Sequence, residues 1–472
     1  MLVVFDKSFG PPETPARNIT FKRRAGGRKR IARTLYPGRF EKGGHPMTSR
    51  RQNTTRRSFL AGGTGLVAGA LAGFPMPALA KTRPVRVGIA LPRTGPLALF
   101  AEHLPFVMDQ VERATKYTVD VGGSDRQVEF IIKDTQSSPN RASQVALELI
   151  LDDGVDVIMA SGTPETTNPV ADQCELNGMP CLTTEAPLEP YFLGRKGDPA
   201  VGFEWTNHFY FSGTQAGGAI LQIFGQVDTN RVVGALWPND SDGNTFAQIF
   251  PPVLAEQGMT LSDPGRFDMP LASYSAAVAK FKADNVEIVH GIIPPPEFTT
   301  FYNEAIQQNF IPKVLYAGKT SAFPSALETF GERAHRLVTE VPWGPQFPYT
   351  SPITGQTAAE VVAEYHAASG RQWNSQLGFK LAMFEVLFAG LARVEDLDDP
   401  ESVQKGISAI SDDTIVGRVD FSKGPFPNTA VTPIAGGQWL EGTEFPLRLA
   451  ITENTFAPDV KVEATTLPML PA

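Results

Sequence analysis

The sequence VRVGIALPRTGP, residues 85–96, sets a pattern that the rest of the chain repeats. Its first six residues form a short run of mainly apolar side chains, and a turn rich in Pro, Gly and Thr follows at once. Such a run bounded by turn residues indicates a buried strand. We therefore predict a strand from Val85 to Ala90 that begins an α/β domain.

Short apolar runs continue to alternate with amphipathic stretches, as is typical of parallel strands joined by helices. In the first half we predict further strands at 128–133, 155–160 and 180–183, and helices at 106–114 and 139–153. The pattern restarts at Arg231, with strands predicted at 232–236, 286–292 and 314–317, and helices at 245–256, 277–282 and 297–308. The sequence therefore predicts an α/β protein with two Rossmann-like lobes, each built on a parallel sheet.

Two later helices, at 358–368 and 377–394, and short strands at 415–421 and 431–434 follow the second lobe. We therefore expect the chain to cross between the lobes three times, near Trp205, Glu340 and Phe426. Lobe 1 is then 81–205 plus 341–426, and lobe 2 is 206–340 plus 427–472. A chain of 472 residues is long enough for two hydrophobic cores. The tail after Ile451 is expected to be mostly irregular.

Basic residues are concentrated near the N-terminus. Residues 1–80 contain 15 Lys and Arg against 3 Asp and Glu, whereas residues 81–472 contain 27 against 47. The body of the chain therefore has a net charge near −20. Because binding phosphates requires a basic face, this charge disfavours nucleic acid as a partner.

The segment TRRSFL, residues 55–60, is typical of a twin-arginine export signal. A glycine-rich, mildly apolar stretch follows, and Ala78-Leu79-Ala80 supplies the small residues that signal peptidase accepts. We predict export to the periplasm, with 47–80 as the signal peptide and Lys81 as the mature N-terminus. Residues 1–46 show no apolar period, so we expect translation to start at Met47; a long natural extension is the alternative.

No pattern in the sequence indicates catalysis or a cofactor. The chain has no phosphate loop, no glycine fingerprint after the first strand and no nucleophile elbow, and its six histidines lack metal-ligand spacing. Two cysteines, Cys174 and Cys181, do not by themselves form a metal site, and buried thiols are favoured over a disulfide. We expect a binding protein, not an enzyme, with no cofactor and no metal.

Ser, Thr and Gly gather in turns at the carboxyl ends of two predicted strands. SGTPETT, residues 161–167, follows the third strand, and TTEA, residues 183–186, follows the fourth. In open α/β sheets ligands bind at this edge, where helix N-termini present free N–H groups. Both turns are candidate ligand-binding segments; ordinary helix capping by Ser and Thr is the alternative.

An ordered series of segments adds a family resemblance: GIAL at 88–91 with TGP at 94–96, DGVDVI at 153–158, TNPVAD at 167–172 and GMP at 178–180. The series resembles the type I periplasmic binding proteins of the leucine/isoleucine/valine-binding family, which serve branched-chain amino acid ABC transporters. It covers residues 83–450. The resemblance implies a venus-flytrap, in which two lobes joined by three strands close on a small-molecule ligand. It also implies permease subunits as partners, and we expect a monomer.

By position, the resemblance assigns four residues to the ligand's carboxylate: Thr163, Thr166, Thr184 and Ala186. Two further candidate ligand-binding residues, Thr94 and Glu185, lie in the turns after the first and fourth predicted strands. From the second lobe it adds the turns that contain Asp242, Pro295 and Lys319. Six aromatic residues fall near strand ends or crossings, where their flat faces would line the cleft. They are Trp205, Tyr210, Trp237, Trp343, Phe347 and Tyr349.

Lys319 departs from the family pattern. Amino-acid binders of this family place an acidic group near this turn to pair with the ligand's ammonium, whereas this chain has Tyr316-Ala317-Gly318-Lys319. Because like charges repel strongly in a closed cleft, Lys319 favours a carboxylate ligand without an amine, aromatic or aliphatic, or a neutral amide. An amino-acid-like ligand, the ordinary class of the family, is the alternative ligand. A Lys319 that points to solvent is the alternative.

The leading interpretation is thus an exported solute-binding protein of an ABC importer. An exported sensor with the same fold, which signals to a regulatory partner, is the alternative. An exported enzyme is a third class, because a fold does not dictate a function, but it would require a nucleophile with a base or a metal set, and the sequence shows neither.

Overall fold

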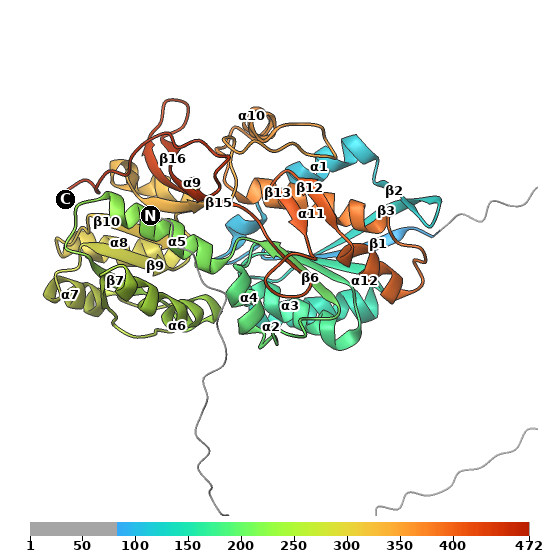
Figure 1. The fold of residues 1–472 in the computed structure, drawn as a ribbon, viewed down its shortest axis with the longest axis horizontal. Coiled ribbons are helices and arrows are strands. Elements are labelled where there is room, and N and C mark those ends of the chain that lie inside the picture. Colours follow the sequence, from blue (N-terminus) through green and yellow to red (C-terminus); the bar gives the residue numbers. More distant parts are fainter. Residues whose placement is uncertain (1–82, 472) are drawn as a thin grey trace, which may run out of the picture. The chain divides into compact units, whose positions relative to one another are not determined.

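The computed structural model describes residues 83–471. The predicted N-terminal extension, 1–46, and signal peptide, 47–80, lie outside these residues. The described part contains two seven-stranded sheets and a small two-stranded sheet. Figure 1 shows each large sheet with helices packed on it. The predicted fold class, two α/β lobes, is confirmed.

The first sheet has the strand order β14-β6-β5-β4-β1-β3-β2, and only the β2–β3 pair is antiparallel. Its strands are β1 (Val85–Leu91), β2 (Thr118–Val121), β3 (Ser124–Asp134), β4 (Val157–Ser161), β5 (Cys181–Thr184), β6 (Thr206–Tyr210) and β14 (Thr429–Val431). Its helices are η1 (Ala98–Ala101), α1 (Leu104–Thr115), α2 (Pro139–Leu147), η2 (Glu148–Asp152), α3 (Pro164–Asn177), α4 (Leu188–Gly194), α10 (Ala358–Ser369), α11 (Gln376–Leu391) and α12 (Pro400–Ser408). This sheet and these helices form lobe 1, with the hairpin β12 (Ser411–Thr414) and β13 (Gly417–Asp420) beside α11.

The second sheet has the order β16-β15-β11-β10-β9-β7-β8, with β15 antiparallel to both of its neighbours. Its strands are β7 (Val232–Leu236), β8 (Thr260–Ser262), β9 (Ile288–Ile292), β10 (Val314–Gly318), β11 (Val338–Val341), β15 (Ile434–Glu441) and β16 (Leu447–Phe456). Its helices are α5 (Gly213–Gln226), α6 (Ser241–Glu256), α7 (Ser275–Ala283), α8 (Pro295–Gln307), α9 (Pro324–Leu327) and η3 (Glu328–Ala334). These elements form lobe 2. β16 extends five residues past Ile451, so the irregular tail begins later than predicted.

Two of the three crossings between the sheets lie later than predicted. β6 pairs with β5, so the first crossing follows Tyr210 instead of Trp205. β14 pairs with β6, so the third crossing follows Val431 instead of Phe426, and the predicted strand 431–434 is divided between two sheets. The second crossing follows Val341, one residue from the predicted position. β6 was not predicted as a strand, because its polar residues interrupt the apolar pattern on which the strand predictions rest.

His208 shows why such a polar strand is stable in the interior. Its Nδ1 lies 2.9 Å from the Thr183 hydroxyl, and its Nε2 lies 2.9 Å from the Ala186 carbonyl oxygen. The ring also stacks on Tyr191. Burial lowers the pKa of His208 to about 3, so the imidazole is neutral near pH 7. A polar side chain with satisfied partners can thus occupy a core strand.

Local chemistry sets a boundary of each of two helices, and the start at Pro139 is as predicted. Ser138 caps α2, since its hydroxyl accepts a hydrogen bond from the Arg141 N–H at 3.4 Å. α3 ends at Asn177 because Gly178 takes a left-handed conformation with φ 63°. Cys174 and Cys181 are both buried free thiols.

Helix α11 is buried along almost its whole length and contains two ionisable residues, Lys380 and Glu385. Glu385 accepts a hydrogen bond from the Ile415 N–H at 2.8 Å through Oε2, while its Oε1 has no partner among the described residues. Burial raises the pKa of Glu385 to about 7. The folded chain therefore holds a proton on this carboxyl more tightly than the unfolded chain does.

The variant Glu385→Gln tests this difference in the pKa of Glu385 between the folded and the unfolded chain. A carboxyl with a raised pKa contributes stability that is fully present below its unfolded pKa, near 4.5, and is lost as the pH rises to about 7. The wild-type free energy of unfolding, relative to that of Glu385→Gln, should therefore fall by up to about 3 kcal/mol between pH 4.5 and pH 7.5. Urea denaturation of both proteins across this range measures the fall. A constant difference would contradict the prediction.

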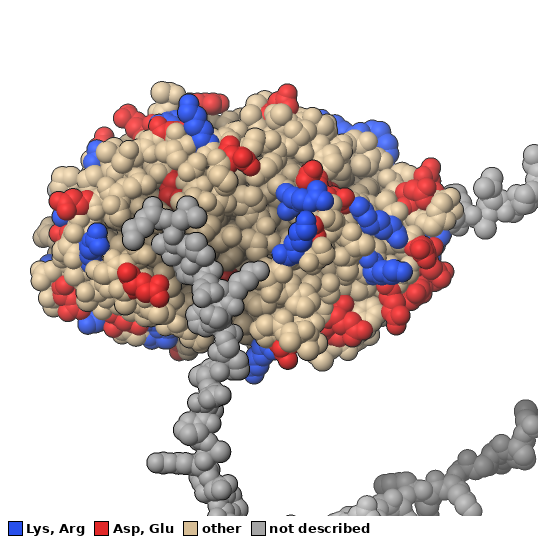
Figure 2. Space-filling view, viewed as in Figure 1, with Lys and Arg blue, Asp and Glu red and all other residues tan. Residues whose placement is uncertain are grey.

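No helix within 83–471 is long and apolar enough to span a membrane. On the face shown in Figure 2, acidic and basic side chains are interspersed over both lobes.

Candidate ligand cavity

A cavity with about 500 Å³ of space free of protein atoms, part of it open to solvent, lies between the two lobes. Its lobe 1 wall consists of Phe100, Thr163, Pro164, Glu185, Pro187, Tyr210, Phe211 and Gln376. Its lobe 2 wall consists of Ala216, Asp242, Phe246, Ile292, Tyr316, Gly318, Lys319, Ala322 and Glu340. Most of these residues lie at or after the carboxyl ends of β4, β5, β6, β7, β9 and β10, where parallel sheets place ligands.

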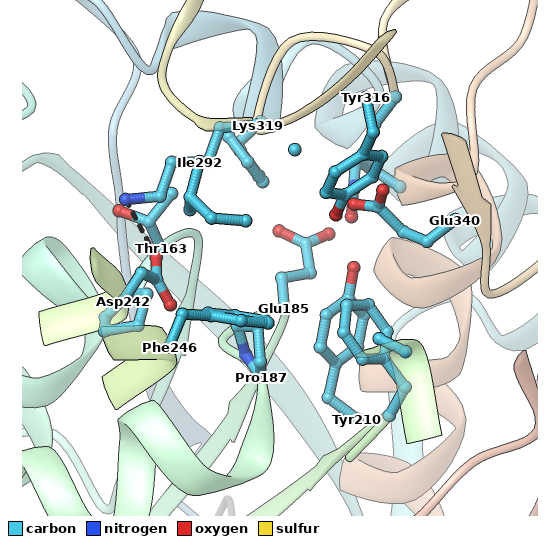
Figure 3. Close-up of a pocket in the computed structure, with 17 residues that line it drawn as sticks. Thr163, Glu185, Pro187, Tyr210, Asp242, Phe246, Ile292, Tyr316, Lys319 and Glu340 are labelled. Carbon is cyan, nitrogen blue, oxygen red and sulfur yellow. Dashed lines mark ion pairs between the residues drawn. The ribbon is translucent and has the colours of Figure 1, made fainter. Parts of the chain in front are cut away.

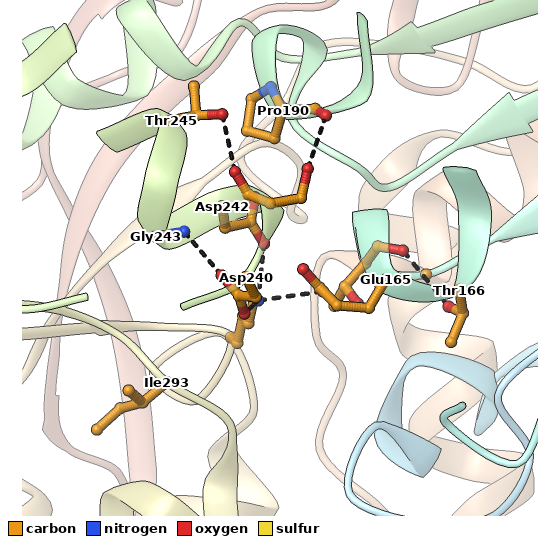
Figure 4. A network of polar contacts seen from close by, with 12 residues as sticks. Glu165, Thr166, Pro190, Asp240, Asp242, Gly243, Thr245 and Ile293 are labelled. Carbon is orange, nitrogen blue, oxygen red and sulfur yellow. Dashed lines mark hydrogen bonds and ion pairs between the residues drawn. The ribbon is translucent and has the colours of Figure 1, made fainter. Parts of the chain in front are cut away.

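Lys319 lies in this wall among three carboxylates. Its Nζ is 2.8 Å from Asp242 Oδ2, 3.0 Å from Asp240 Oδ2 and 3.2 Å from Glu165 Oε2. Figure 4 shows these three acidic side chains brought together from α3 and from the start of α6. Burial disfavours the charged lysine, but the carboxylates outweigh it and hold the pKa of Lys319 well above its ordinary value. Burial raises the pKa of Asp242 to about 7.

This cluster corrects the expectation that Lys319 would repel a ligand's ammonium. One ammonium group faces three carboxylates, so its charge is already offset within the protein. The alternative in which Lys319 points to solvent is also wrong, because the residue is only 8% exposed. Since Glu165 belongs to lobe 1, the Lys319–Glu165 pair also joins the two lobes.

The helix N-termini at this edge are occupied by the protein's own carboxylates. Glu165, Asp242 and Glu297 lie in the first turns of α3, α6 and α8. Asp240 caps α6 and accepts a hydrogen bond from the Gly243 N–H at 2.8 Å. Because a helix N-terminus favours a negative charge, these acids suit their positions, and Glu165 lies at the helix N-terminus beside Thr163 and Thr166, to which the resemblance assigned a ligand carboxylate.

Glu185 enters the cavity from the turn after β5 with a left-handed backbone, φ 71°. For a residue other than Gly this conformation costs about 1–2 kcal/mol, and such strain is concentrated at functional sites. Its Oε1 pairs with Lys380 Nζ of α11, both side chains being fully buried, and its Oε2 has no partner among the described residues. Burial raises the pKa of Glu185 and lowers that of Lys380, while each partner opposes the shift of the other.

A second acidic residue, Glu340, faces the cavity from β11. Figure 3 shows its carboxylate beside the hydroxyl groups of Tyr316 and Tyr210, with the Glu185 carboxylate directed toward the same end. Burial raises the pKa of Glu340. We had not predicted Glu340 or Tyr316 as site residues. The available signal was a single carboxylate within the mainly apolar run LVTEVPW, residues 337–343.

Four of the ten predicted site residues line this cavity: Thr163, Glu185, Asp242 and Lys319. The hydroxyl groups of the other three predicted threonines donate hydrogen bonds to residues of lobe 1 instead. Thr94 is exposed and donates to Asp134 Oδ2 at 2.6 Å, Thr166 donates to the Thr163 carbonyl at 3.4 Å, and Thr184 donates to the Phe209 carbonyl at 2.7 Å.

Ala186, Trp237 and Pro295 also lie away from the cavity wall. Ala186 is fully buried against Tyr191 and Phe192. Trp237 is fully buried in lobe 2, where its Nε1 donates to His290 Nδ1 at 2.8 Å. Pro295 occupies the first position of α8.

Of the six aromatic residues expected at the cleft, only Tyr210 lines the cavity. The others, Trp205, Trp237, Trp343, Phe347 and Tyr349, pack away from this wall. The aromatic lining comes instead from Phe100, Phe211, Phe246 and Tyr316. Sequence position near a strand end did not reveal which face of the strand each ring occupies.

Within residues 83–471, no group of three or more His, Cys, Asp or Glu side chains is arranged to hold a metal ion.

Two sheets joined by three crossings, with a cavity between them, define the two-lobed fold of type I periplasmic binding proteins. A sequence model described as periplasmic binding protein matches residues 84–443, so the chain belongs to this family. No curated protein sequence matches the chain.

Several solved structures share the fold. The leucine-binding protein LivK from Thermotoga maritima MSB8 is 18% identical, with a TM-score of 0.64 over 79% of this chain and 99% of that chain. A solute-binding protein of an ABC transporter from Rhodopseudomonas palustris BisB5, in complex with 3,4-dihydroxybenzoic acid, is 16% identical, with a TM-score of 0.62 over 80% and 98%. The substrate-binding protein LivJ from Streptococcus pneumoniae, in complex with isoleucine, is 12% identical, with a TM-score of 0.58 over 79% and 100%.

Proposed function

We propose that this protein is the exported solute-binding component of an ABC importer, which encloses a small organic solute between its lobes and delivers it to membrane permease subunits. The observation that carries this proposal is the cavity whose walls come from both lobes. Two further contacts join the lobes beside it: the Lys319–Glu165 ion pair and the edge-to-face contact of Phe100 with Phe323, whose ring centroids are 4.9 Å apart. A solute held by both walls would stabilise the closed arrangement.

The family and the N-terminal sequence support the remaining parts of the proposal. Proteins with this fold bind leucine, isoleucine or hydroxylated benzoates, all of which are small organic solutes. The twin-arginine pattern at 55–60 and the Ala-Leu-Ala site at 78–80 support export to the periplasm. The protein would act as a monomer, bind without a cofactor and leave its solute chemically unchanged.

A thermal-shift screen of residues 81–472 tests this function. The solutes are amino acids, aromatic and aliphatic carboxylates, amides and amines. A solute at 100 times its Kd should stabilise the folded chain by about 2.7 kcal/mol, which raises Tm by a few degrees. No shift with any of these solutes would contradict the proposal.

Ala216→Trp should abolish this stabilisation. Ala216 lies on α5, is 3% exposed and lines the cavity, so an indole at this position would fill the space that the solute needs. We expect the solute's affinity to fall by about 100-fold or more, measured by calorimetric titration, and the free energy of unfolding to fall by about 1–3 kcal/mol because the indole overpacks the site. Thr214→Trp, on an exposed position of the same helix, is the matched control and should bind normally. Normal binding by Ala216→Trp would place the solute elsewhere.

A further inference from the structure

One end of the cavity is lined by acidic and phenolic oxygen atoms. Glu185, Glu340, Tyr210 and Tyr316 direct their oxygens toward a common region (Figure 3), which we call the hinge-side end. Tyr210 is the last residue of β6, immediately before the first crossing, and Glu340 lies in β11, immediately before the second. Carboxylate oxygens only accept hydrogen bonds when ionised, and phenols can accept them, so this end is suited to a ligand group rich in donors.

Two carboxylates at this end can accept further hydrogen bonds. Glu185 is 2% exposed, and its Oε2 has no hydrogen-bond partner among residues 83–471. Glu340 forms no ion pair within the described part of the chain, although its Oε2 accepts a hydrogen bond from the Thr339 hydroxyl at 3.4 Å. A buried carboxylate oxygen without a partner is costly, so an incoming donor would recover the lost interaction.

The ionisable groups around the cavity also have an excess of negative charge. Five carboxylates, from Glu165, Glu185, Asp240, Asp242 and Glu340, face two ammonium groups, from Lys319 and Lys380. The formal net charge is therefore −3 when all groups are ionised. Both lysines are already paired with carboxylates of the protein. In a cavity of low dielectric constant, such an excess attracts a cation and repels an anion.

The opposite end of the cavity combines apolar side chains with Thr163 and the Lys319–Asp242 ion pair, whose charges already offset each other. Figure 3 shows Phe246, Pro187 and Ile292 across the cavity from Glu340 and the two tyrosines. Phe100 and Phe211 add further aromatic surface to the wall. A solute that satisfies both ends therefore has one cationic donor group and an apolar body.

We infer that the hinge-side end binds the ammonium group of a primary amine, whose apolar body lies against Phe246, Pro187 and Ile292. The inference rests on the proposed solute-binding function and specifies its solute class. It reverses the carboxylate ligand favoured by the sequence. The ammonium group donates to Glu340 and to the free oxygen of Glu185, and its charge offsets the surplus of carboxylates.

Calorimetric titration of residues 81–472 with matched solutes tests the inference. The probes are 2-phenylethylamine and 3-methylbutylamine, compared with 3-phenylpropanoate, 4-methylpentanoate and 3-phenylpropanamide. We expect at least one of the amines to bind at least about tenfold more tightly than the carboxylate and amide of similar shape. Glu340→Gln should weaken amine binding by about tenfold or more, because it removes the charge but keeps the shape.

Glu256→Gln is the matched control, since this exposed residue at the end of α6 lies far along the helix from the cavity wall. The Tm of each unliganded variant shows whether it is folded. Should Glu340→Gln fail to fold, the double variant Glu185→Gln/Lys380→Met, which removes both charges of one pair, provides the same test on the neighbouring carboxylate.

Equal or tighter binding of the carboxylates or the amide would overturn the inference, as would the failure of both amines to bind. Amine binding that a folded Glu340→Gln variant leaves unchanged would also overturn it. These failures differ from failure of the proposed function. Binding of a non-amine that Ala216→Trp blocks would leave the function intact, whereas the absence of binding by every class of solute would overturn both.

Discussion

Lys380→Met is expected to lower the free energy of unfolding by about 3–5 kcal/mol, because it leaves the buried carboxylate of Glu185 without its partner. Both side chains are fully buried in the wild type. Burial already raises the pKa of Glu185 despite Lys380, so the variant's carboxyl should take up a proton more readily. The destabilisation should therefore be larger at pH 8 than at pH 5.

The double variant Glu185→Gln/Lys380→Met is the control for this first prediction. It removes both charges, so its free energy of unfolding should exceed that of Lys380→Met at pH 8. Urea denaturation of the wild type and of both variants at the two pH values gives the comparison. A single variant that loses less than about 1 kcal/mol, or a double variant that is the less stable of the two, would show that the pair is not a buried ion pair.

Trp343→Ala is expected to lower the free energy of unfolding by a similar amount, about 3–5 kcal/mol. Trp343 follows the second crossing and is fully buried. Its Nε1 donates to the Ile415 carbonyl at 2.8 Å, and its carbonyl accepts from the Ser375 hydroxyl at 2.6 Å. The ring lies so close to Gly378 of α11 that a Cβ there would overlap it. Removing the ring leaves a large cavity where the crossing meets lobe 1.

Two comparisons make this second prediction specific. Trp205→Ala should cost less, because Trp205 is only partly buried. Gly378→Ala should destabilise the wild type but should be well tolerated in the Trp343→Ala background, because the ring that obstructs the new methyl group is gone. Equal costs for the two tryptophans, or the same cost of Gly378→Ala in both backgrounds, would contradict the packing described above.

The fold could be predicted from the sequence wherever strands were apolar and helices had clear boundaries. β1 and β7 match their predicted positions to within one residue, since each is a short apolar run. β6 was missed because it contains Asn207 and His208, whose partners come from distant residues such as Thr183. A pattern based on hydrophobicity cannot recognise a polar residue that is satisfied by tertiary contacts.

The candidate site could be predicted only in part, for a related reason. The turns that contain Thr163 and Glu185 follow predicted strands, so sequence position was enough to select them, whereas the turn with Lys319 was selected by the family resemblance. The meaning of Lys319 depends on Glu165, which lies in the other lobe and approaches it only in the folded chain. Glu340 also reaches the cavity only because the second crossing places β11 beside it.

The central claim is that a solute binds between the two lobes. Hydrogen–deuterium exchange of residues 81–472, with and without a saturating solute from the thermal-shift screen, tests it most directly. The account predicts slower exchange in peptides of both walls, at residues 161–166 and 183–187 of lobe 1 and at 240–246 and 316–322 of lobe 2. Protection confined to one lobe, or to surfaces away from these segments, would contradict it.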